Sequence, residues 1–185
     1  DRIEAGTLLI AGAITGGAVT VTDCVPQHLE ALTDKMQECG FEIVTTDSTV
    51  SVAATDSWTA ADITTSPYPG FPTDLQAQFM ALMTQAQGTS VITEGIFENR
   101  FMHVAELQRM GADIEVEGNT AIVRGVKKLT AAPVMATDLR ASVSLIIAGP
   151  HWMPLGVGVS YALYQHIVTR SFNWGWYGTP HATLT

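Results

Sequence analysis

A unit of one helix, one strand, a second helix and a β-hairpin occurs twice in this chain, and this repeat limits the possible folds more than any other feature. In the first unit, hydrophobic periodicity predicts a helix over 2–15, a strand over 19–22, a helix over 26–39 and a hairpin of 42–46 with 49–53. Gly16 and Gly40 directly follow the two predicted helices. Glycine commonly ends a helix because it tolerates positive φ angles.

The second unit repeats this order. It predicts a helix over 74–87, a strand over 90–96, a helix over 103–110 and a hairpin of 113–116 with 120–124. Gly88 and Gly111 follow its helices, Thr73 is the expected N-cap of the first, and Thr137 is the expected N-cap of a helix over 138–149 that begins a third unit. Such units predict an α/β domain. Because the first helix of each unit is apolar almost all round, we expect these helices to lie inside the sheets.

The composition is that of an acidic globular protein. Its 185 residues are 46% hydrophobic and 15% charged, with a formal net charge of −9, which argues against nucleic acid as a partner. Cys24 and Cys39 are too few for a disulfide framework, so we expect reduced thiols. The chain opens without an apolar signal segment, and the apolar run 143–149 is too short to cross a bilayer. We therefore expect a cytoplasmic protein without a membrane partner.

The last part of the chain differs in character from the rest. Residues 139–185 contain no Asp or Glu although the chain carries 18, and neither helical period nor strand alternation persists through 150–185. Ordinary domains are about a quarter charged, so such a stretch is unusual. We divide the chain into a domain over 1–149 and an atypical tail over 150–185. For the tail we favour an out-of-frame or disordered segment, and a natural aromatic-rich extension or a lipid-facing segment over 153–167 are the alternatives.

Three charged side chains suggest a site for a small anionic substrate. Asp74 lies at the predicted start of a helix, and Arg100 and Arg140 follow in the second and third units. The planar Arg guanidinium matches carboxylate and phosphate oxygens, and an Asp carboxylate can accept a proton from a hydroxyl. Each residue also has a structural explanation: an offset of the helix dipole for Asp74, a solvated loop for Arg100, and an ion pair with Asp138 for Arg140.

Two histidines hold similar places in the second helices of the two units. These residues are His28 and His103, and no third ligand or catalytic partner accompanies them in the sequence. We therefore predict structural roles for both and no metal site.

The segments that carry the charged residues resemble one known family. The similarity is densest in Asp1-Arg-Ile-Glu-Ala-Gly6, Phe71-Pro-Thr-Asp-Leu-Gln76, Phe97-Glu-Asn-Arg-Phe-Met-His103, Arg109-Met-Gly-Ala112 and Asp138-Leu-Arg-Ala-Ser142. Together they resemble the C-terminal half of the UDP-N-acetylglucosamine 1-carboxyvinyltransferases, the enolpyruvyl transferases of peptidoglycan synthesis. The resemblance covers 1–149. The related shikimate-pathway enolpyruvyl transferases share that fold but are not expected to carry the second and third stretches together.

The resemblance implies a fold of two domains, each of three repeated α/β units with internal helices, an inside-out α/β barrel of which this chain holds an incomplete part. It implies transfer of enolpyruvate from phosphoenolpyruvate to the 3-hydroxyl of UDP-N-acetylglucosamine with release of phosphate, the first committed step of peptidoglycan synthesis. No metal or cofactor is implied. By the same resemblance Asp74 contacts the sugar hydroxyl and is the proposed base, and Ile96 contacts the UDP-sugar through its backbone. Arg100 and Arg140 face the phosphoenolpyruvate.

The chain also departs from the family pattern. The N-terminal domain, with its lysine–asparagine pair and its loop bearing a reactive cysteine, has no counterpart here, and neither Cys24 nor Cys39 fits that loop. The family continuation after the third helix, which carries an arginine in an Asp-Arg-Gly-Tyr context, is replaced by 150–185. We therefore expect an incomplete form of the enzyme that partners the missing domain in a longer chain. The alternatives are a non-catalytic UDP-sugar-binding module and a non-functional remnant.

Overall fold

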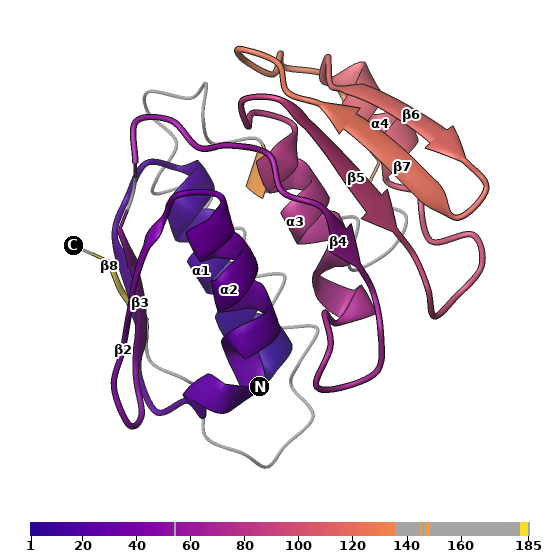
Figure 1. Cartoon of the computed structure of the whole chain (residues 1–185). Coiled ribbons are helices and arrows are strands. Elements are labelled where there is room, and N and C mark those ends of the chain that lie inside the picture. The colour runs from indigo at the N-terminus through magenta and orange to yellow at the C-terminus, as the bar shows by residue number, and fades with distance from the viewer. Residues whose placement is uncertain (54, 136–144, 146, 149–181, 185) are drawn as a thin grey trace.

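A computed structural model of the chain describes residues 1–53, 55–135, 145, 147–148 and 182–184. The described part folds into two four-stranded sheets with helices packed against them (Figure 1). With η marking a 3₁₀ helix, the elements in chain order are α1 (Arg2–Ile14), β1 (Val19–Val21), η1 (Pro26–Leu29), α2 (Glu30–Glu38), β2 (Glu42–Thr45), β3 (Val50–Ala53), β4 (Ile63–Thr64), η2 (Thr73–Leu75), α3 (Gln76–Met83), β5 (Thr89–Thr93), α4 (Val104–Arg109), β6 (Asp113–Glu117), β7 (Thr120–Arg124) and β8 (Ala182–Leu184).

The two sheets have the same internal order, which confirms the repeat. Their strand orders are β2-β3-β1-β8 and β6-β7-β5-β4, so in each unit the second hairpin strand pairs with the strand that precedes the second helix. Both of these pairs are antiparallel, with Val19 opposite Val52 in the first sheet and Ile92 opposite Ala121 in the second. The outer fourth strands differ, because β8 runs antiparallel to β1 whereas β4 runs parallel to β5. Neither outer strand was predicted from the sequence.

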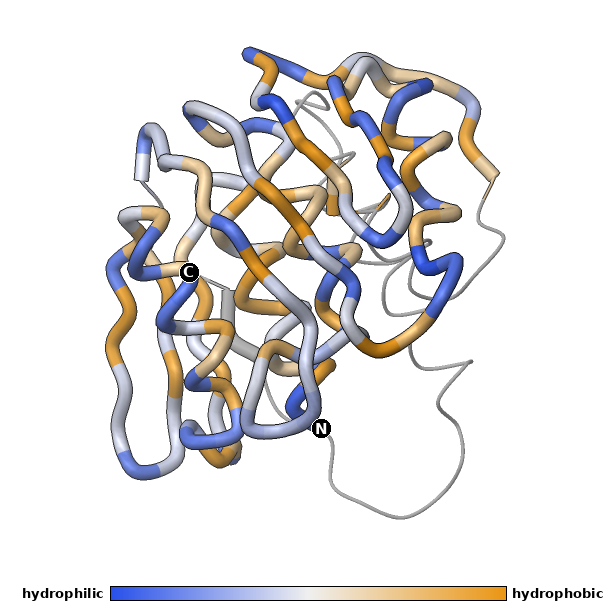
Figure 2. The backbone as a smooth tube through the Cα atoms, turned by 45° about the vertical axis from the view of Figure 1, so that its right-hand side comes forward, coloured by the Kyte–Doolittle hydropathy of each residue, from blue (hydrophilic) through white to orange (hydrophobic). Residues whose placement is uncertain are grey.

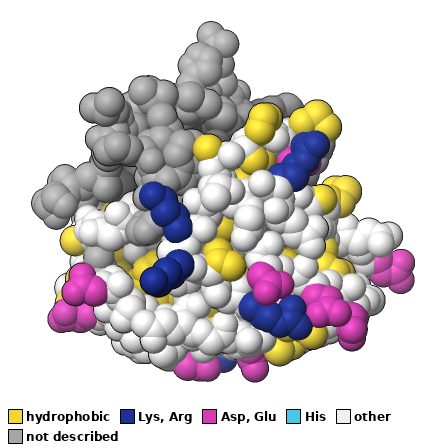
Figure 3. Space-filling model, turned by 90° about the horizontal axis from the view of Figure 1, so that it is seen from above, with side chains coloured by type: hydrophobic (Ala, Val, Ile, Leu, Met, Phe, Trp, Pro, Cys, Tyr) yellow, Lys and Arg dark blue, Asp and Glu magenta, His cyan; other side chains and the backbone are white. Residues whose placement is uncertain are grey.

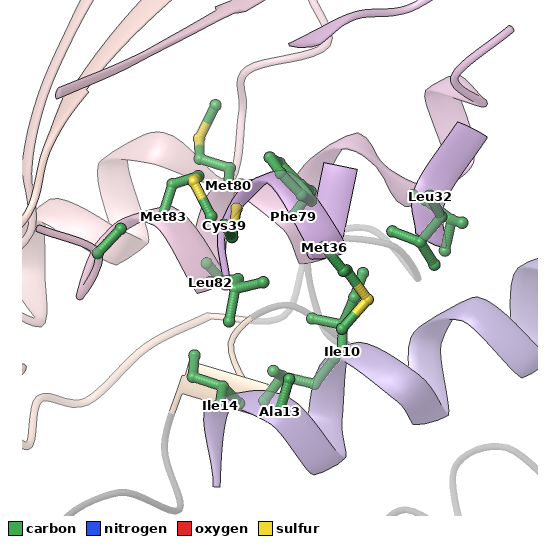
Figure 4. Close-up of a cluster of buried hydrophobic side chains, with 14 of the residues drawn as sticks. Ile10, Ala13, Ile14, Leu32, Met36, Cys39, Phe79, Met80, Leu82 and Met83 are labelled. Carbon is green, nitrogen blue, oxygen red and sulfur yellow. The ribbon is translucent and has the colours of Figure 1, made fainter. Parts of the chain in front are cut away.

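The first helix of each unit is buried, as its apolar sequence predicts. All eight residues of α3 are buried, and so are eight residues of α1. The two helices pack against each other and lie between the sheets (Figure 1). Side chains of α1, α2 and α3 meet in the core, among them Ile10, Met36 and Phe79 (Figure 4). Hydrophobic residues are concentrated in these central elements, and hydrophilic residues lie mostly in turns and loops (Figure 2).

Four glycines predicted to follow helices adopt the conformation that this role requires. Gly16, Gly40, Gly88 and Gly111 have φ angles of 73°, 101°, 108° and 89°. An L side chain is strained in this left-handed region, whereas glycine is not. Gly16, Gly40 and Gly111 directly follow the C-cap residues of α1, α2 and α4, as predicted, whereas Gly88 lies beyond the end of α3 at Met83.

The predicted helix over 74–87 is shorter than expected and begins differently. Thr73 does not cap it: the chain enters through η2, and the Thr73 hydroxyl donates a hydrogen bond to Glu94 instead. The α-helical part ends at Met83, because the next residues bond to other segments. The Thr84 carbonyl accepts from the amide of Val126 at 2.7 Å, and Gln87 exchanges backbone hydrogen bonds with the segment around Trp58. These long-range bonds replace the bonds that would have continued the helix.

Two further boundaries differ from the sequence-based prediction. The strand expected over 90–96 ends at Thr93, and the helix expected over 26–39 starts as the 3₁₀ helix η1 before α2. The predicted helix over 138–149 and nearly all of the tail over 150–185 lie outside the described residues, so the domain boundary stays a prediction. No helix in the described ranges is long and apolar enough to cross a membrane. On the face shown in Figure 3, acidic and basic side chains are dispersed among uncharged ones.

Candidate functional site

The turn that carries Asp74 is anchored on the core. Pro72 has an extended backbone, and its carbonyl accepts a hydrogen bond from the amide of Leu75 at 3.0 Å, which closes the turn η2. Leu75 is fully buried and packs closely against Gly6 of α1, where an added Cβ would lie 2.6 Å from a Leu75 methyl group. The neighbouring Asp74 side chain keeps 39% of its surface exposed. A buried anchor therefore presents a carboxylate that a ligand can reach.

Arg100 is held by the aromatic ring of Phe97. The guanidinium carbon lies 4.2 Å from the ring centroid, the geometry of a cation–π contact. Between the two residues Asn99 adopts a positive φ of 56°, which bends the chain so that both side chains meet. The Arg100 side chain is 20% exposed although Phe97 is half-exposed. The segment after β5 thus presents a positioned guanidinium at the surface.

Asp74 and Arg100 meet across the two segments. One guanidinium nitrogen, Nη1, lies 3.9 Å from the carboxylate oxygen Oδ1, which is ion-pair distance but too long for a hydrogen bond. Of the sequence-predicted site residues, these two are brought together, and Ile96 lies in the same segment as Arg100. Arg140 falls outside the described residues. The arrangement places a carboxylate, which can accept a proton, beside a cation.

Glu94 is a member of the site that the sequence analysis did not single out. Its side chain is 3% exposed, and its carboxylate accepts four hydrogen bonds. Oε1 accepts from the Thr65 hydroxyl at 2.7 Å, from the Ile96 amide at 2.9 Å and from the Phe97 amide at 3.2 Å. Oε2 accepts from the Thr73 hydroxyl at 2.8 Å. One buried carboxylate therefore bonds both segments of the site.

The protonation of Glu94 follows from these contacts. Burial raises the pKa of the carboxyl group, but the hydrogen bonds from Thr65, Ile96, Thr73 and Phe97 lower it more, so the net pKa lies below the ordinary value of 4.5. The group is therefore an anion at neutral pH. The sequence held a signal for its burial, because Ser90 and Ile92 are also buried and residue 94 continues this period of two.

A glycine next to Glu94 lets two backbones approach. The Gly95 amide donates to the Thr65 hydroxyl at 2.8 Å, and a Cβ at this position would lie 2.6 Å from the Thr65 carbonyl oxygen. The Glu94 backbone is also fixed, because its amide donates to the Asn119 carbonyl at 2.8 Å and its carbonyl accepts from the Asn119 side chain at 3.1 Å. The end of β5 is therefore rigidly placed on both sides.

Both histidines lie near aromatic rings. The His103 side chain is 3% exposed and its ring lies 6.4 Å from that of Phe101. The His28 ring lies edge-on to the Tyr68 ring, with 5.8 Å between the ring centroids. The Arg2 guanidinium carbon lies 4.9 Å from the centroid of the Tyr68 ring.

The cysteines lack the character of reactive thiols. Burial raises the pKa of the Cys39 thiol to about 12, with a further increase from Glu38. Burial also raises the pKa of Cys24, which is half-buried. A nucleophilic cysteine needs a lowered pKa, so neither residue matches a reactive loop cysteine.

Comparisons with known proteins show the family to which this chain is similar. The family model described as EPSP synthase (3-phosphoshikimate 1-carboxyvinyltransferase) matches residues 1–155. A protein of Bdellovibrio bacteriovorus named UDP-N-acetylglucosamine 1-carboxyvinyltransferase is 71% identical over 150 residues, which are 80% of this chain and 36% of the relative. Proteins of the same name from Geobacter metallireducens and Myxococcus xanthus are each 62% identical over 149 residues, again 80% of this chain and 36% of the relative.

A solved structure with lower sequence identity has a similar fold. The crystal structure of the enolpyruvyl transferase NikO from Streptomyces tendae superimposes with a TM-score of 0.72 at 24% sequence identity, and the match covers 82% of this chain and 36% of that one. At this identity the likeness concerns the fold alone. The chain thus spans about a third of the length of the proteins it matches.

Proposed function

The chain belongs to the EPSP synthase family of carboxyvinyltransferases, and from this premise we propose that it carries one part of an enolpyruvyl transferase site. The proposed reaction moves enolpyruvate from phosphoenolpyruvate to the 3-hydroxyl of UDP-N-acetylglucosamine and releases phosphate. Support for this acceptor comes from the 62–71% identical relatives, whose names specify it. The observation that carries the proposal is the approach of Arg100 to Asp74 at 3.9 Å.

Asp74 is the proposed base. In the addition, the sugar hydroxyl loses a proton as its oxygen bonds to the central carbon of phosphoenolpyruvate, and the terminal carbon gains a proton. In the elimination, the terminal carbon loses a proton as the bond to phosphate breaks, which restores the double bond. A carboxylate within hydrogen-bond reach of the sugar hydroxyl can accept the proton that this hydroxyl loses. The Asp74 side chain is 39% exposed although its Oδ1 atom is buried, so a sugar hydroxyl would approach the carboxylate from its exposed side.

Arg100, together with Arg140, is proposed to stabilise the anionic substrate. The tetrahedral intermediate holds both the carboxylate and the phosphate until phosphate leaves, and guanidinium groups offset that charge. A charged hydrogen bond of this kind contributes about 1.5–3 kcal/mol. Stacking on Phe97 orients the Arg100 guanidinium before a ligand arrives, which lowers the entropy lost on binding.

Ile96 is proposed to contact the UDP-sugar through its backbone. Its amide already donates to Glu94 at 2.9 Å. Since that donor is committed, the contact with the sugar would come from the Ile96 carbonyl, which accepts hydrogen bonds. The preferred ligand group is therefore a donor, such as an amide or hydroxyl hydrogen of the sugar.

The wider setting is also part of the proposal. Two repeated units with buried first helices suit an inside-out α/β barrel completed by further units. We place the domain over 1–149, and the tail over 150–185 apart from it. Because the proposed acceptor is UDP-N-acetylglucosamine, we also propose that the protein is cytoplasmic and acts in the first committed step of peptidoglycan synthesis. Since an interdomain site must hold two substrates together, we expect this chain by itself to bind better than it turns over.

Calorimetry with UDP-N-acetylglucosamine tests the proposal. We expect measurable binding by the chain, weakened about tenfold or more by Asp74→Asn and by Arg100→Ala, because each variant removes a charged contact worth about 1.5–3 kcal/mol. Asp34→Asn and Arg124→Ala are matched controls, since both residues are exposed and lie on α2 and β7. Absence of binding by the unmodified chain, or equal losses in the controls, would count against the proposal. Phosphate release measured in parallel reports turnover.

A further inference from the structure

Glu94 is a buried ionised group that the proposed chemistry does not use. Its four donors are the hydroxyls of Thr65 and Thr73 and the amides of Ile96 and Phe97, and no Lys or Arg of the described residues forms an ion pair with it. Burying a carboxylate is costly unless several hydrogen bonds stabilise the charge. The four hydrogen bonds therefore stabilise the buried charge of Glu94.

The two carboxylate oxygens serve different segments. Oε1 holds the turn after β5 through the amides of Ile96 and Phe97. Oε2 holds the entry of η2 through the hydroxyl of Thr73. Thr73 directly precedes Asp74 in the chain. The carboxylate is therefore the shared partner of two segments that are far apart in sequence.

Each of these segments carries one member of the ion pair. On one side, Thr73 is covalently joined to Asp74. On the other side, the Phe97 amide bonds to Glu94 while the Phe97 ring supports the Arg100 guanidinium at 4.2 Å. Both routes are short and each link has a defined geometry. Glu94 is therefore linked to both members of the ion pair, whose nearest atoms lie 3.9 Å apart.

We propose that Glu94 is a positioning residue, whose carboxylate sets the distance and orientation between Asp74 and Arg100 by bonding Thr73 and the Ile96–Phe97 backbone at once. It does not touch substrate and takes no part in proton transfer. The effect of Glu94 on binding rests on the proposed function, since Asp74 is the proposed base and Arg100 the proposed contact for the anionic substrate. The positioning role itself is argued only from the hydrogen bonds of Glu94.

Thr73 provides the sharpest test, because it can be changed without opening a cavity. Thr73→Val keeps the shape of the side chain but removes the hydroxyl that donates to Oε2, while Thr73→Ser keeps the donor. Thr33→Val is the control: its hydroxyl bonds to the carbonyls of Leu29, the last residue of η1, and Glu30, the first residue of α2, away from the site. Thr73→Val and Thr33→Val therefore remove the same group at different places.

The first readout needs no ligand. In ¹⁵N–¹H spectra of the full chain, Thr73→Val is expected to shift the Phe97 amide and the Arg100 Nε–H, because both are held through Glu94. Thr73→Ser should restore their unmodified positions, and Thr33→Val should leave them unchanged. Unshifted Phe97 and Arg100 signals in Thr73→Val would overturn the proposal, whatever the chain binds.

The second readout is affinity for UDP-N-acetylglucosamine by calorimetry. Thr73→Val is expected to weaken binding about tenfold, and to weaken it much less when Arg100→Ala is already present, because residues coupled through one network are non-additive. Additive losses would mean that Thr73 contributes only to stability, which would refute the positioning role. If the unmodified chain binds no UDP-sugar, the proposed function fails while the spectra still decide the role of Glu94.

Glu94 itself gives a confirming pair of variants. Glu94→Gln can retain the three hydrogen bonds to Oε1, and its amide can donate to the Thr73 hydroxyl, so its spectrum should stay close to that of the unmodified chain. Glu94→Ala loses all four bonds and should shift the Phe97 and Arg100 signals at least as far as Thr73→Val does. Equal spectra for the Gln and Ala variants would contradict the proposal.

Discussion

The guanidinium of Arg100 lies 4.2 Å above the ring of Phe97 while its Nη1 atom lies 3.9 Å from Asp74. Arg100 is therefore held from two sides, by an aromatic face and by a carboxylate. Arginine suits this place better than lysine, since its planar group stacks on a ring and still directs several donors outward. The pair with Asp74 leaves other guanidinium donors for an anionic ligand.

Removing the ring should loosen Arg100. A partly exposed cation–π contact contributes about 0.5–1 kcal/mol, so Phe97→Leu is expected to lower the order parameter of the Arg100 Nε–H bond, measured by ¹⁵N relaxation. Phe97→Tyr keeps the aromatic face and should keep the original order. An order parameter in Phe97→Leu equal to that of the unmodified chain would show that Asp74 alone restrains the guanidinium.

Adding one methyl group beside Glu94 should destabilise the fold. Gly95→Ala places a Cβ 2.6 Å from the Thr65 carbonyl oxygen, and because that atom belongs to the backbone it cannot rotate away. Overpacking of this kind costs about 1–3 kcal/mol, which urea denaturation would detect. Gly17→Ala is the control, since its Cβ would meet nothing closer than 3.9 Å. Equal stabilities of the two variants would argue against the close approach.

The thiols should resist alkylation in the folded chain. With a pKa of about 12, Cys39 would be a thiolate in only about one molecule in ten thousand at pH 8, and it is also buried. We expect iodoacetamide to modify Cys39 far more slowly than Cys24, whose pKa is raised less and which is half-buried. Peptide mass spectrometry after timed quenching measures both rates, and a urea-denatured sample provides the fully reactive reference. Rapid labelling of folded Cys39 would contradict the predicted burial.

Acid should weaken the fold through Glu94. Its pKa is lower in the folded chain than its ordinary value of 4.5, so the anion stabilises the fold at neutral pH. This contribution is complete above the unfolded pKa and is lost as the pH falls below about 4.5 through the folded pKa. Urea midpoints measured from pH 7 to pH 3 should therefore fall less in Glu94→Gln than in the unmodified chain. Glu42→Gln, exposed on β2, is the control and should follow the unmodified curve.

Local features of the chain could be predicted well. Gly16, Gly40 and Gly111 were interpreted as helix stops, and each follows a helix end with a positive φ angle, whereas Gly88 has a positive φ angle but lies beyond the end of α3. The hairpins β2–β3 and β6–β7 lie within a residue or two of their predicted bounds. Steric limits on φ and the periodicity of apolar residues act over a few neighbouring residues, so they can be interpreted without knowledge of the fold.

The candidate site could be predicted only in part. Asp74 and Arg100 were chosen from side-chain chemistry and from the family resemblance, and the structure brings them together. Their catalytic roles stay predictions, as do those of Ile96 and of Arg140, which lies outside the described residues. Glu94 was missed although it continues the period of two of its predicted strand, because an acidic residue is seldom buried and its four hydrogen-bond partners are known only from the structure.

The amino-acid sequence by itself determined the repeated unit, the apolar internal helices and the turns between elements, because each depends on residues that are neighbours in the chain. The tertiary structure alone decided where α3 ends, that Thr73 bonds to Glu94 instead of capping a helix, and how far Asp74 lies from Arg100. In all three cases the deciding partner is distant in sequence. A polar group with both a local and a distant partner available takes the one that the packed core brings within hydrogen-bond reach.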